Sequence, residues 1–433
     1  MSRPRRIFSL LTLALLVGAV FWFRFCAQAD TAAAVPAHLP QPAIPIDWVE
    51  DLNHSLSNDL SNLPAMDQVV DSFMTFWSLK GVSLAVVRHD SLLYARGYGK
   101  ADAATPMTPG TTLRLASVSK LLTAIGIMRL QEQGKVFLET PVFGPFGVLN
   151  EYDPYIKDEN YYLMTVDHLL RHQGGFSTRG GDVMFSTLSF MRKHGLSEPP
   201  SSKLLVSKEL ARPLSFEPGT SQEYSNFGYL LLSLIIEKVS GMSYEDFMQA
   251  QVFEPARCHG FRLGGDYLKD RLPGETRYYT QPDDQPTPSF DGKHASVERC
   301  YGGNYISGLL GAGGWTGSVP ELARLVCAID GTGPVPDILD PFSVRQMTVW
   351  FDDDTYGLGW LDCRPDGEWT RTGSYAGTSA LVKKYADGET WILVTNTSTW
   401  RGSRFSRNTS ALCKNLRSRF DSQLPVRDLF REN

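Results

Sequence analysis

Segments that favour β-strands stand near the two ends of this chain, and a long region of helical patterns separates them. Short runs rich in β-branched and aromatic residues predict strands over residues 82–88 and 92–97. The same signals predict four more strands near the end, over residues 356–362, 368–374, 379–385 and 390–395. Residues 111–331 carry mainly helical periodicity. Because strands segregated from helices form antiparallel sheets, we expect an α/β (α+β) fold in which helices flank an antiparallel sheet and an all-helical lobe is inserted.

The length of 433 residues fits two or three lobes, at about 150 residues per domain. We expect a helix over residues 403–420 to close the folded part of the chain. The predicted boundaries are 47–425 for the domain, about 47–105 and 332–425 for its sheet lobe, about 106–331 for its helical lobe, and 426–433 for a tail.

A polar stretch with several Pro and Gly covers residues 264–303 and predicts a long surface loop. Loops of this length are often functional lids, and a tolerated insertion explains the stretch equally well. Both interpretations stay open at this point.

The charge balance is slightly acidic, with 42 basic and 47 acidic side chains and a net charge of −5. Nucleic-acid phosphates bind basic surfaces, so this balance argues against a nucleic-acid partner. Hydrophobic residues make up 42% of the chain and charged residues 21%, which excludes a disordered or collagen-like protein. The chain has a single long apolar run, which excludes a protein with several membrane spans.

The N-terminus has the features of a targeting segment. A basic start precedes an apolar run over residues 7–23, and Ala27-Gln28-Ala29 offers a cleavage site. Residues 1–29 are therefore interpreted as a signal peptide or as an uncleaved membrane anchor. Both place the domain outside: secreted, periplasmic or tethered through residues 7–23. A mitochondrial presequence is a minor alternative. Residues 30–46, rich in Ala and Pro, predict an extended linker.

The six cysteines are Cys26, Cys258, Cys300, Cys327, Cys363 and Cys413. None forms a C-x-x-C motif, which removes support for a zinc or thioredoxin-type site. An exported domain can form disulfides, and the candidate pairs are Cys258 with Cys300 and, more weakly, Cys363 with Cys413. The alternative is that none of them pairs. Cys327 lies in an apolar helical stretch and is predicted to be a buried thiol.

The segment Ser117-Val118-Ser119-Lys120 is the only S-x-x-K in the chain. It opens a strongly apolar predicted helix that ends at Gly134, and Lys120 is the only charged residue between Arg114 and Arg129. Lysine is seldom buried without a partner or a task, and loss of solvent lowers its pKa towards that of a proton acceptor. Residues three apart share a helix face, so the hydroxyl of Ser117 and the amine of Lys120 can meet. A capping serine with a solvent-reaching lysine is the structural alternative.

Two further motifs carry reactive side chains. Tyr224-Ser225-Asn226 precedes a second apolar helix that ends at Gly241. A phenol beside an amide can relay protons and hold a carbonyl group, although Asn226 also fits a helix N-cap and Tyr224 a core aromatic residue. Arg371-Thr372-Gly373-Ser374 places a cation on a predicted strand, and Gly373 allows that strand to approach another segment closely. An ordinary strand before a turn explains this third motif as well.

Together these three motifs resemble those of the serine β-lactamase and penicillin-binding protein superfamily, in particular its class C-like branch. The order S-x-x-K, Y-x-N and a K-T-G-like element is the one that this branch uses. Residues 165–175, 216–241, 313–314 and 356–360 also fit, so the resemblance covers about residues 48–421. It implies the β-lactamase/transpeptidase-like fold.

The resemblance also implies roles for individual residues. Ser117 is the acylated nucleophile, and Lys120 and Tyr224 share the general-base and proton-relay work. Asn226 contacts the substrate's amide group, and the backbone N–H groups of Ser117 and Ser374 form the oxyanion hole. No deacylating glutamate can be assigned, so Tyr224 and Lys120 also activate the water.

Arg371 stands where the superfamily usually has Lys or His, and with Gly373 and Ser374 it completes the implied substrate-binding strand. The planar guanidinium of Arg371 does not replace an ammonium group one for one. The departure from K-T-G makes an esterase or a peptidase a better expectation than a true β-lactamase.

The sequence therefore predicts an exported serine hydrolase that cleaves a small-molecule or peptide ester or amide through an acyl-Ser117 intermediate. The alternative is a catalytically inactive relative that binds or scaffolds at the cell surface. No metal or other cofactor is expected, because the chain has no H-E-x-x-H motif. It also has no G-x-S-x-G motif, so the α/β-hydrolase alternative lacks its nucleophile.

Overall fold

The computed structural model describes residues 48–281, 283–333, 335–350 and 356–431. The predicted targeting segment, the linker and Cys26 lie outside the described residues. Within these ranges, no helix is both long enough and apolar enough to cross a membrane.

The strands of the described chain are β1 (Gly81–Arg88), β2 (Ser91–Gly99), β3 (Leu113–Arg114), β4 (Arg262–Leu263), β5 (Trp315–Gly317), β6 (Asp362–Cys363), β7 (Trp369–Tyr375), β8 (Thr378–Lys384) and β9 (Glu389–Thr395). The α-helices are α2 (Leu52–Ser55), α3 (Pro64–Trp77), α4 (Ser119–Glu132), α5 (Val166–Leu170), α6 (Thr187–His194), α7 (Ser202–Glu209), α8 (Asn226–Ser240), α9 (Tyr244–Met248), α10 (Val319–Cys327), α11 (Pro341–Thr348) and α12 (Ser406–Phe420). Short 3₁₀ turns connect several of them, of which η2 (Ala116–Val118), η5 (Val183–Phe185) and η8 (Ser307–Ala312) lie near the site described below.

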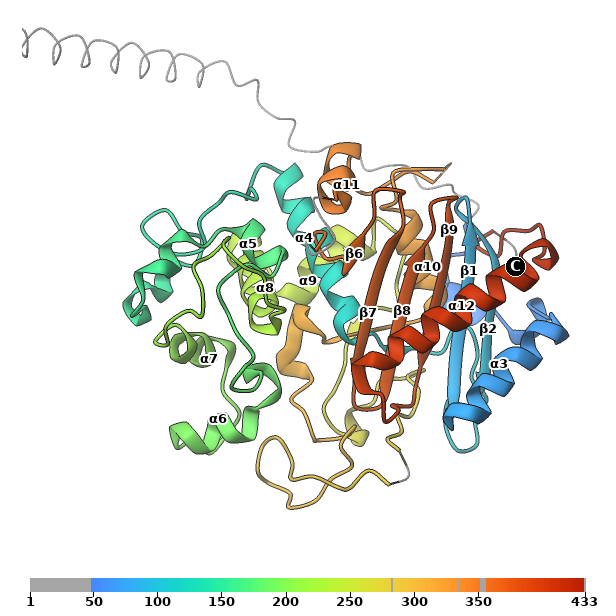
Figure 1. Cartoon of the computed structure of the whole chain (residues 1–433), viewed down its shortest axis with the longest axis horizontal. Helices are drawn as coiled ribbons and strands as arrows, with labels where there is room; N and C mark the ends of the chain where they lie inside the picture. The colour runs from blue at the N-terminus through green and yellow to red at the C-terminus, as the bar shows by residue number, and fades with distance from the viewer. Residues whose placement is uncertain (1–47, 282, 334, 351–355, 432–433) are drawn as a thin grey trace, which may run out of the picture. The chain divides into compact units, whose positions relative to one another are not determined.

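The main sheet has the strand order β2-β1-β9-β8-β7-β6 in the described chain, and every neighbouring pair is antiparallel. The N-terminal hairpin therefore pairs with the last strand, so that Val82 of β1 lies opposite Thr395 of β9. Figure 1 shows the resulting arrangement, in which segments from the two ends of the chain share one sheet. This confirms the expectation of an antiparallel sheet that the chain leaves and later completes.

Helices cover both faces of this sheet. Because successive strand residues point to opposite faces, Val82, Leu84 and Val86 pack towards α3 and α12, whereas Ala85 and Val87 pack towards the helical part of the chain. Figure 1 shows α3 and α12 crossing one face of the sheet. Burial on both faces explains why β1 reads as an almost continuous apolar run.

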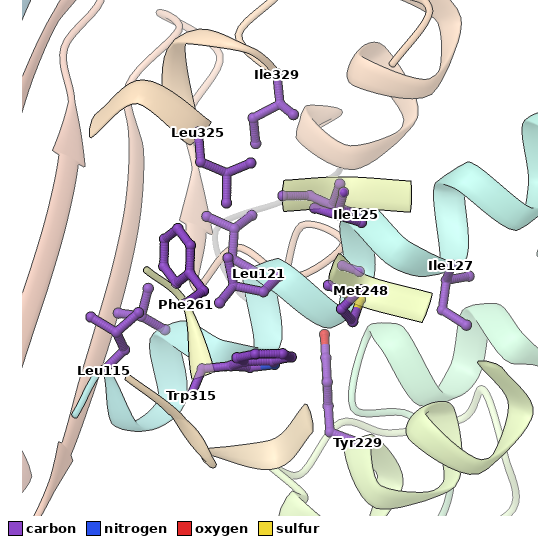
Figure 2. Close-up of a cluster of buried hydrophobic side chains, with 14 of the residues drawn as sticks. Leu115, Leu121, Ile125, Ile127, Tyr229, Met248, Phe261, Trp315, Leu325 and Ile329 are labelled. Atoms are coloured by element: carbon purple, nitrogen blue, oxygen red, sulfur yellow. The ribbon is translucent and has the colours of Figure 1, made fainter. Parts of the chain in front are cut away.

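The second layer is organised around α4, in which every residue from Ser119 to Leu130 is buried. Figure 2 shows Leu121 and Ile125 of this helix within a cluster that also contains Trp315 and Met248. A helix that is buried on all sides can place a polar side chain only where other buried groups satisfy it. This constraint determines the environment of Lys120.

Three predicted features differ from the structure. The region predicted as all-helical also contains the small sheet β3-β5-β4. The strand predicted over residues 356–362 is reduced to β6, because Gly359 has φ +80° and packs against the backbone of α4, where a Cβ would lie 2.9 Å from Leu121 Cα. The folded part also extends past the predicted boundary at 425, since Leu429 and Phe430 are fully buried.

The long stretch 264–303 forms few regular elements, in agreement with the predicted loop, but part of it is packed. Tyr278, Cys300 and Tyr301 form a small buried cluster, and the guanidinium of Arg114 lies 4.4 Å from the Tyr278 ring centre. This part of the loop is therefore anchored on β3.

Neither candidate disulfide forms, in agreement with the alternative that none of the described cysteines pairs. Cys258, Cys300, Cys363 and Cys413 are all free and buried. The spacing of cysteines in a sequence does not constrain the distance between their Cα atoms, which decides whether a bridge can close. Cys327, at the end of α10, is buried as predicted.

A thiol count on the full chain with Cys26→Ser tests whether the other five cysteines are free and buried. We expect the five described cysteines to react with Ellman's reagent only after denaturation. The native protein should react slowly, because burial both excludes the reagent and raises the pKa of a thiol such as Cys300, to about 12. A count in non-reducing denaturant that is lower by two for each bridge would show that a disulfide does form.

Candidate active site

Ser117 lies in the short turn η2, directly before α4. The helix that the sequence predicts to begin at Ser117 thus begins two residues later, at Ser119. Ala116 has φ +48°, a left-handed conformation that residues with a side chain rarely adopt. Ser117 is partly exposed, whereas Ala116 and Val118 are completely buried. The strained turn therefore presents one hydroxyl to the space between α4 and β7.

Lys120, one turn further on, has no exposed surface. Its Nζ donates to Asn226 Oδ1 at 2.6 Å and to the carbonyl oxygen of Ala312 at 2.5 Å, and it lies 3.3 Å from Ser117 Oγ. These partners come from α8, η8 and η2. Burial lowers the pKa of Lys120 to about 8, so a large share of the amine is neutral at mildly alkaline pH.

The phenol of Tyr224 completes the contact with Ser117. Its hydroxyl donates to Ser117 Oγ at 2.7 Å and accepts from Arg371 Nη2 at 3.3 Å. The Lys120 amine lies 4.8 Å from the centre of the Tyr224 ring. Burial alone would raise the pKa of Tyr224, but the two cations Lys120 and Arg371 hold it below its usual value.

Asn226 is the first residue of α8 and is not its N-cap, contrary to one of the two interpretations above. Ser225 takes that position, and its hydroxyl accepts from the N–H of Gly228 at 3.0 Å. The Asn226 side chain accepts from Lys120, and its Nδ2 donates to Asp182 Oδ2 at 2.5 Å. Both ends of the amide are thus held by protein groups.

Arg371 of β7 is 1% exposed, and its guanidinium lies beside the hydroxyl of Tyr224. Its Nε donates to the carbonyl oxygen of Ser117 at 2.8 Å, and its Nη2 donates to the Tyr224 hydroxyl. Within the described chain, the buried Nη1 has no hydrogen-bond partner. The guanidinium therefore ties the strand to the Ser117 turn and keeps one donor unused.

Gly373 lets β7 approach that turn. A Cβ atom on this residue would lie 2.3 Å from the carbonyl oxygen of Leu115 and 2.8 Å from the N–H nitrogen of Ser117. These are backbone atoms, which cannot move aside as a flexible side chain can. The structure thus confirms that this strand needs a residue without a side chain here.

Ser374 follows on the same strand and lines a groove of about 570 Å³. The groove runs between the β7–β8 turn, the loop that contains Arg299 and the segment around Trp400. Neither Ser117, Lys120 nor Tyr224 lines this groove. The Ser374 side chain alternates with the Gly373 position that faces the Ser117 turn, so it points away from that turn.

The structure brings together Ser117, Lys120, Tyr224, Asn226, Arg371 and Gly373, whereas the Ser374 side chain lines a groove to which none of these six residues contributes. It also adds two groups that the sequence did not indicate. Asp182 sits at the start of η5 in an irregular stretch without a recognisable motif. The Ala312 carbonyl is a backbone group, which no residue type can reveal, although it stands directly before the Gly313-Gly314 pair. In the part of the chain that is described, no cluster of three or more His, Cys, Asp or Glu side chains could hold a metal ion.

Replacing Gly373 by Ala tests the close approach of β7 to the turn. We expect the free energy of unfolding to fall by about 1–3 kcal/mol, because the new methyl group overlaps backbone atoms. Gly180→Ala is the control, since a Cβ there meets nothing within 4 Å. Urea unfolding of both variants measures the difference, and equal stability of the two variants would contradict the packing described here.

Comparison with known proteins relates this chain to β-lactamase-like proteins. The family described as Beta-lactamase matches residues 66–415. The chain is 28% identical to esterase EstB of Burkholderia gladioli over 71% of this chain and 80% of that protein. It is 34% identical to penicillin-binding protein 4* of Bacillus subtilis, over 42% of this chain and 38% of that protein.

Solved structures share the fold. The D-amino acid amidase of Ochrobactrum anthropi SV3 superposes with a TM-score of 0.64 at 21% identity, over 83% of this chain and 99% of that chain. The penicillin-binding protein homologue of Pyrococcus abyssi gives a TM-score of 0.61 at 20% identity, over 81% of this chain and 77% of that chain. Since the family match spans most of the chain and includes all three motifs, this protein belongs to the beta-lactamase family of serine hydrolases.

Proposed function

We propose that this protein hydrolyses an ester or an amide through a covalent acyl intermediate on Ser117. The observation that carries the proposal is that Ser117 Oγ lies within hydrogen-bond distance of both the Tyr224 hydroxyl and the Lys120 amine. A serine hydroxyl becomes a nucleophile when a nearby base takes its proton. Two groups with lowered pKa values stand in that position.

In the proposed first step, Ser117 Oγ attacks the substrate's carbonyl carbon while its proton passes to the neutral Lys120 amine or to Tyr224 in its deprotonated form. The tetrahedral intermediate then collapses, and the bond to the leaving alcohol or amine breaks as that group takes up the proton. Water, deprotonated by the same pair, attacks the acyl carbon and releases the acid. The cycle returns Ser117 to its starting state and consumes one water molecule.

The backbone N–H groups of Ser117 and Ser374 are proposed to stabilise the oxyanion. Arg371 is proposed to act mainly by tying β7 to the Ser117 turn and by stabilising negative charge on Tyr224, because its side chain is 1% exposed and its unused Nη1 is buried. Asn226 is proposed to assist mainly by orienting Lys120, since its amide is already held at both ends.

The substrate class is proposed to be an ester or a peptide-like amide rather than a β-lactam. An esterase, a D-amino acid amidase and proteins described as putative D-alanyl-D-alanine carboxypeptidases are among the similar proteins. Arg371 stands in place of the Lys of the K-T-G motif, and its buried guanidinium is bound to Ser117 and Tyr224 rather than exposed to a β-lactam carboxylate.

The proposal also places the protein outside the cell or facing outward, and its support is the basic and apolar sequence of residues 1–29. The alternative of an inactive binding protein loses support, because Ser117 is in contact with both candidate bases, Lys120 and Tyr224.

Labelling with a fluorophosphonate tests the nucleophile. We expect one probe to attach to the wild-type protein at Ser117 and none to Ser117→Ala, because only an activated hydroxyl reacts. Intact mass and peptide mapping report the adduct. Ser119→Ala is the control, because this neighbouring hydroxyl is fully buried and accepts from the N–H of Trp315.

A folded wild-type protein that takes no label and hydrolyses neither p-nitrophenyl esters, D-amino-acid anilides nor nitrocefin would contradict the proposed function. Faster turnover of nitrocefin than of the esters and anilides would contradict the proposed substrate class alone.

The pH dependence of ester hydrolysis tests the role of Lys120. Since its pKa is lowered to about 8, the neutral amine increases as the pH rises, and we expect kcat/KM to rise by about tenfold per pH unit below 8 and to level off above it. The measurement uses initial rates corrected for spontaneous hydrolysis.

Lys120→Met should lose both the activity and this dependence. Lys135→Met, at an exposed lysine just after α4, should keep both. A wild-type profile that is flat from about pH 6.5 to 9.5 would contradict the assignment of a titrating base.

A further inference from the structure

The imidazole of His172 lies directly beneath the Tyr224 ring. His172 follows α5 closely and is 2% exposed. Its ring centre is 4.4 Å from that of Tyr224, with 33° between the ring planes. Within the described part of the chain His172 makes no hydrogen bond to Ser117, so any effect on the Ser117 hydroxyl passes through Tyr224.

His172 accepts hydrogen bonds from the two residues on either side of Tyr224 in the sequence. The carbonyl oxygen of His172 accepts from the N–H of Glu223 at 3.0 Å, and its Nδ1 accepts from the N–H of Ser225 at 3.1 Å. One residue therefore holds the backbone on both sides of Tyr224 and also contacts its ring. Three contacts of this kind leave the phenol little freedom to turn.

The backbone of His172 has φ +61°, in the left-handed region. Residues with a side chain are uncommon there and persist where the surroundings compel the conformation. This conformation allows the carbonyl and the imidazole of the same residue to reach Glu223 and Ser225 together. The strained backbone of His172 is therefore the one that places both hydrogen-bond acceptors next to Tyr224.

Further rings hold the imidazole in place. Tyr356 packs edge-on at 4.8 Å and Tyr229 lies at 5.1 Å from the His172 ring centre. Tyr229 is itself fixed, because its hydroxyl donates to the carbonyl oxygen of Leu170 at 2.9 Å. The imidazole is therefore a rigid support.

We propose that His172 is a positioning residue, a neutral imidazole that aims the Tyr224 hydroxyl at Ser117 by holding the ring and both flanking peptide groups. This inference rests on the proposed function, in which Tyr224 takes part in proton transfer. It adds a residue to the site for which the motifs suggest no role.

The neutral state follows from the geometry. An Nδ1 atom that accepts from Ser225 carries no proton, so the ring's single proton is on Nε2. Burial, with the nearby cations Lys120 and Arg371, also holds the pKa of His172 well below its usual value. A protonated ring would lose the bond to Ser225 and place a third positive charge beside the phenol.

The variant His172→Asn separates the ring from the hydrogen bonds. The Asn side-chain oxygen can take the place of Nδ1, and Asn tolerates positive φ better than most residues. We expect a loss of about 10- to 100-fold in kcat with KM within about threefold, because a misplacement of about 1 Å at a reacting group costs about this much.

His168→Asn is the matched control. It lies in the same segment, and its Nδ1 also accepts a backbone N–H, that of Thr165 at 3.3 Å. Among the described residues, the rings packed against Tyr224 are those of His172 and Tyr356, not that of His168. We expect its kcat to stay within about twofold of wild type. An equal loss in the two variants, or no loss in His172→Asn, would overturn the proposal.

A double-mutant cycle with Tyr224→Phe gives a readout that a purely structural role would not change. If His172 acts through the phenol, adding His172→Asn to Tyr224→Phe causes no further loss of kcat. Losses that multiply would show that His172 acts independently of Tyr224 and would overturn the proposal.

A crystal structure of His172→Asn provides a test that needs no activity. We expect the Tyr224 hydroxyl to move away from its 2.7 Å contact with Ser117 Oγ. An unchanged contact would overturn the role of His172. This result is distinct from a failure of the proposed function, which would appear as an unlabelled Ser117 in the wild-type protein.

Discussion

The burial of one lysine amine determines how the rest of this site is built. Lys120 sits on a helix without an exposed face, so its Nζ can be satisfied only by protein groups. The partners come from η8, α8 and the Ser117 turn, which are distant in sequence. Burial disfavours the charged amine and brings the pKa of Lys120 towards the range of a useful base, while the contacts of Nζ hold the amine beside Ser117.

The site gathers two cations around one phenol. Lys120 and Arg371 both stabilise negative charge on Tyr224, while His172 below it stays neutral. The planar guanidinium of Arg371 reaches the backbone of Ser117 and the hydroxyl of Tyr224 at once, which a single ammonium group does at less favourable angles. Arg371 thus supports the turn that carries Ser117 and the phenol of Tyr224, and with 1% exposure it offers almost no surface of its own.

The features that could be predicted from the sequence are those that local periodicity encodes. The hairpin predicted over 82–97 agrees with β1 and β2, and the closing helix predicted over 403–420 agrees with α12, because apolar spacing and turn residues act over a few positions. The strand predicted over 356–362 is wrong, since Gly359 has a left-handed backbone where it crosses α4. The sequence left open whether the cysteines pair, because pairing depends on distances that it does not contain, and the described cysteines are all free.

By itself, the sequence determined which chemical groups are present and which segments carry them: a serine and a lysine one helical turn apart, a tyrosine before an apolar helix, and a glycine on a strand next to a cation. Only the tertiary structure decided that these groups meet, that Asn226 is held by Asp182, and that His172 lies under Tyr224. The physical reason is that local patterns follow from backbone geometry over a few residues. Contacts between distant segments follow from the packing of the whole core, which no short stretch of sequence specifies.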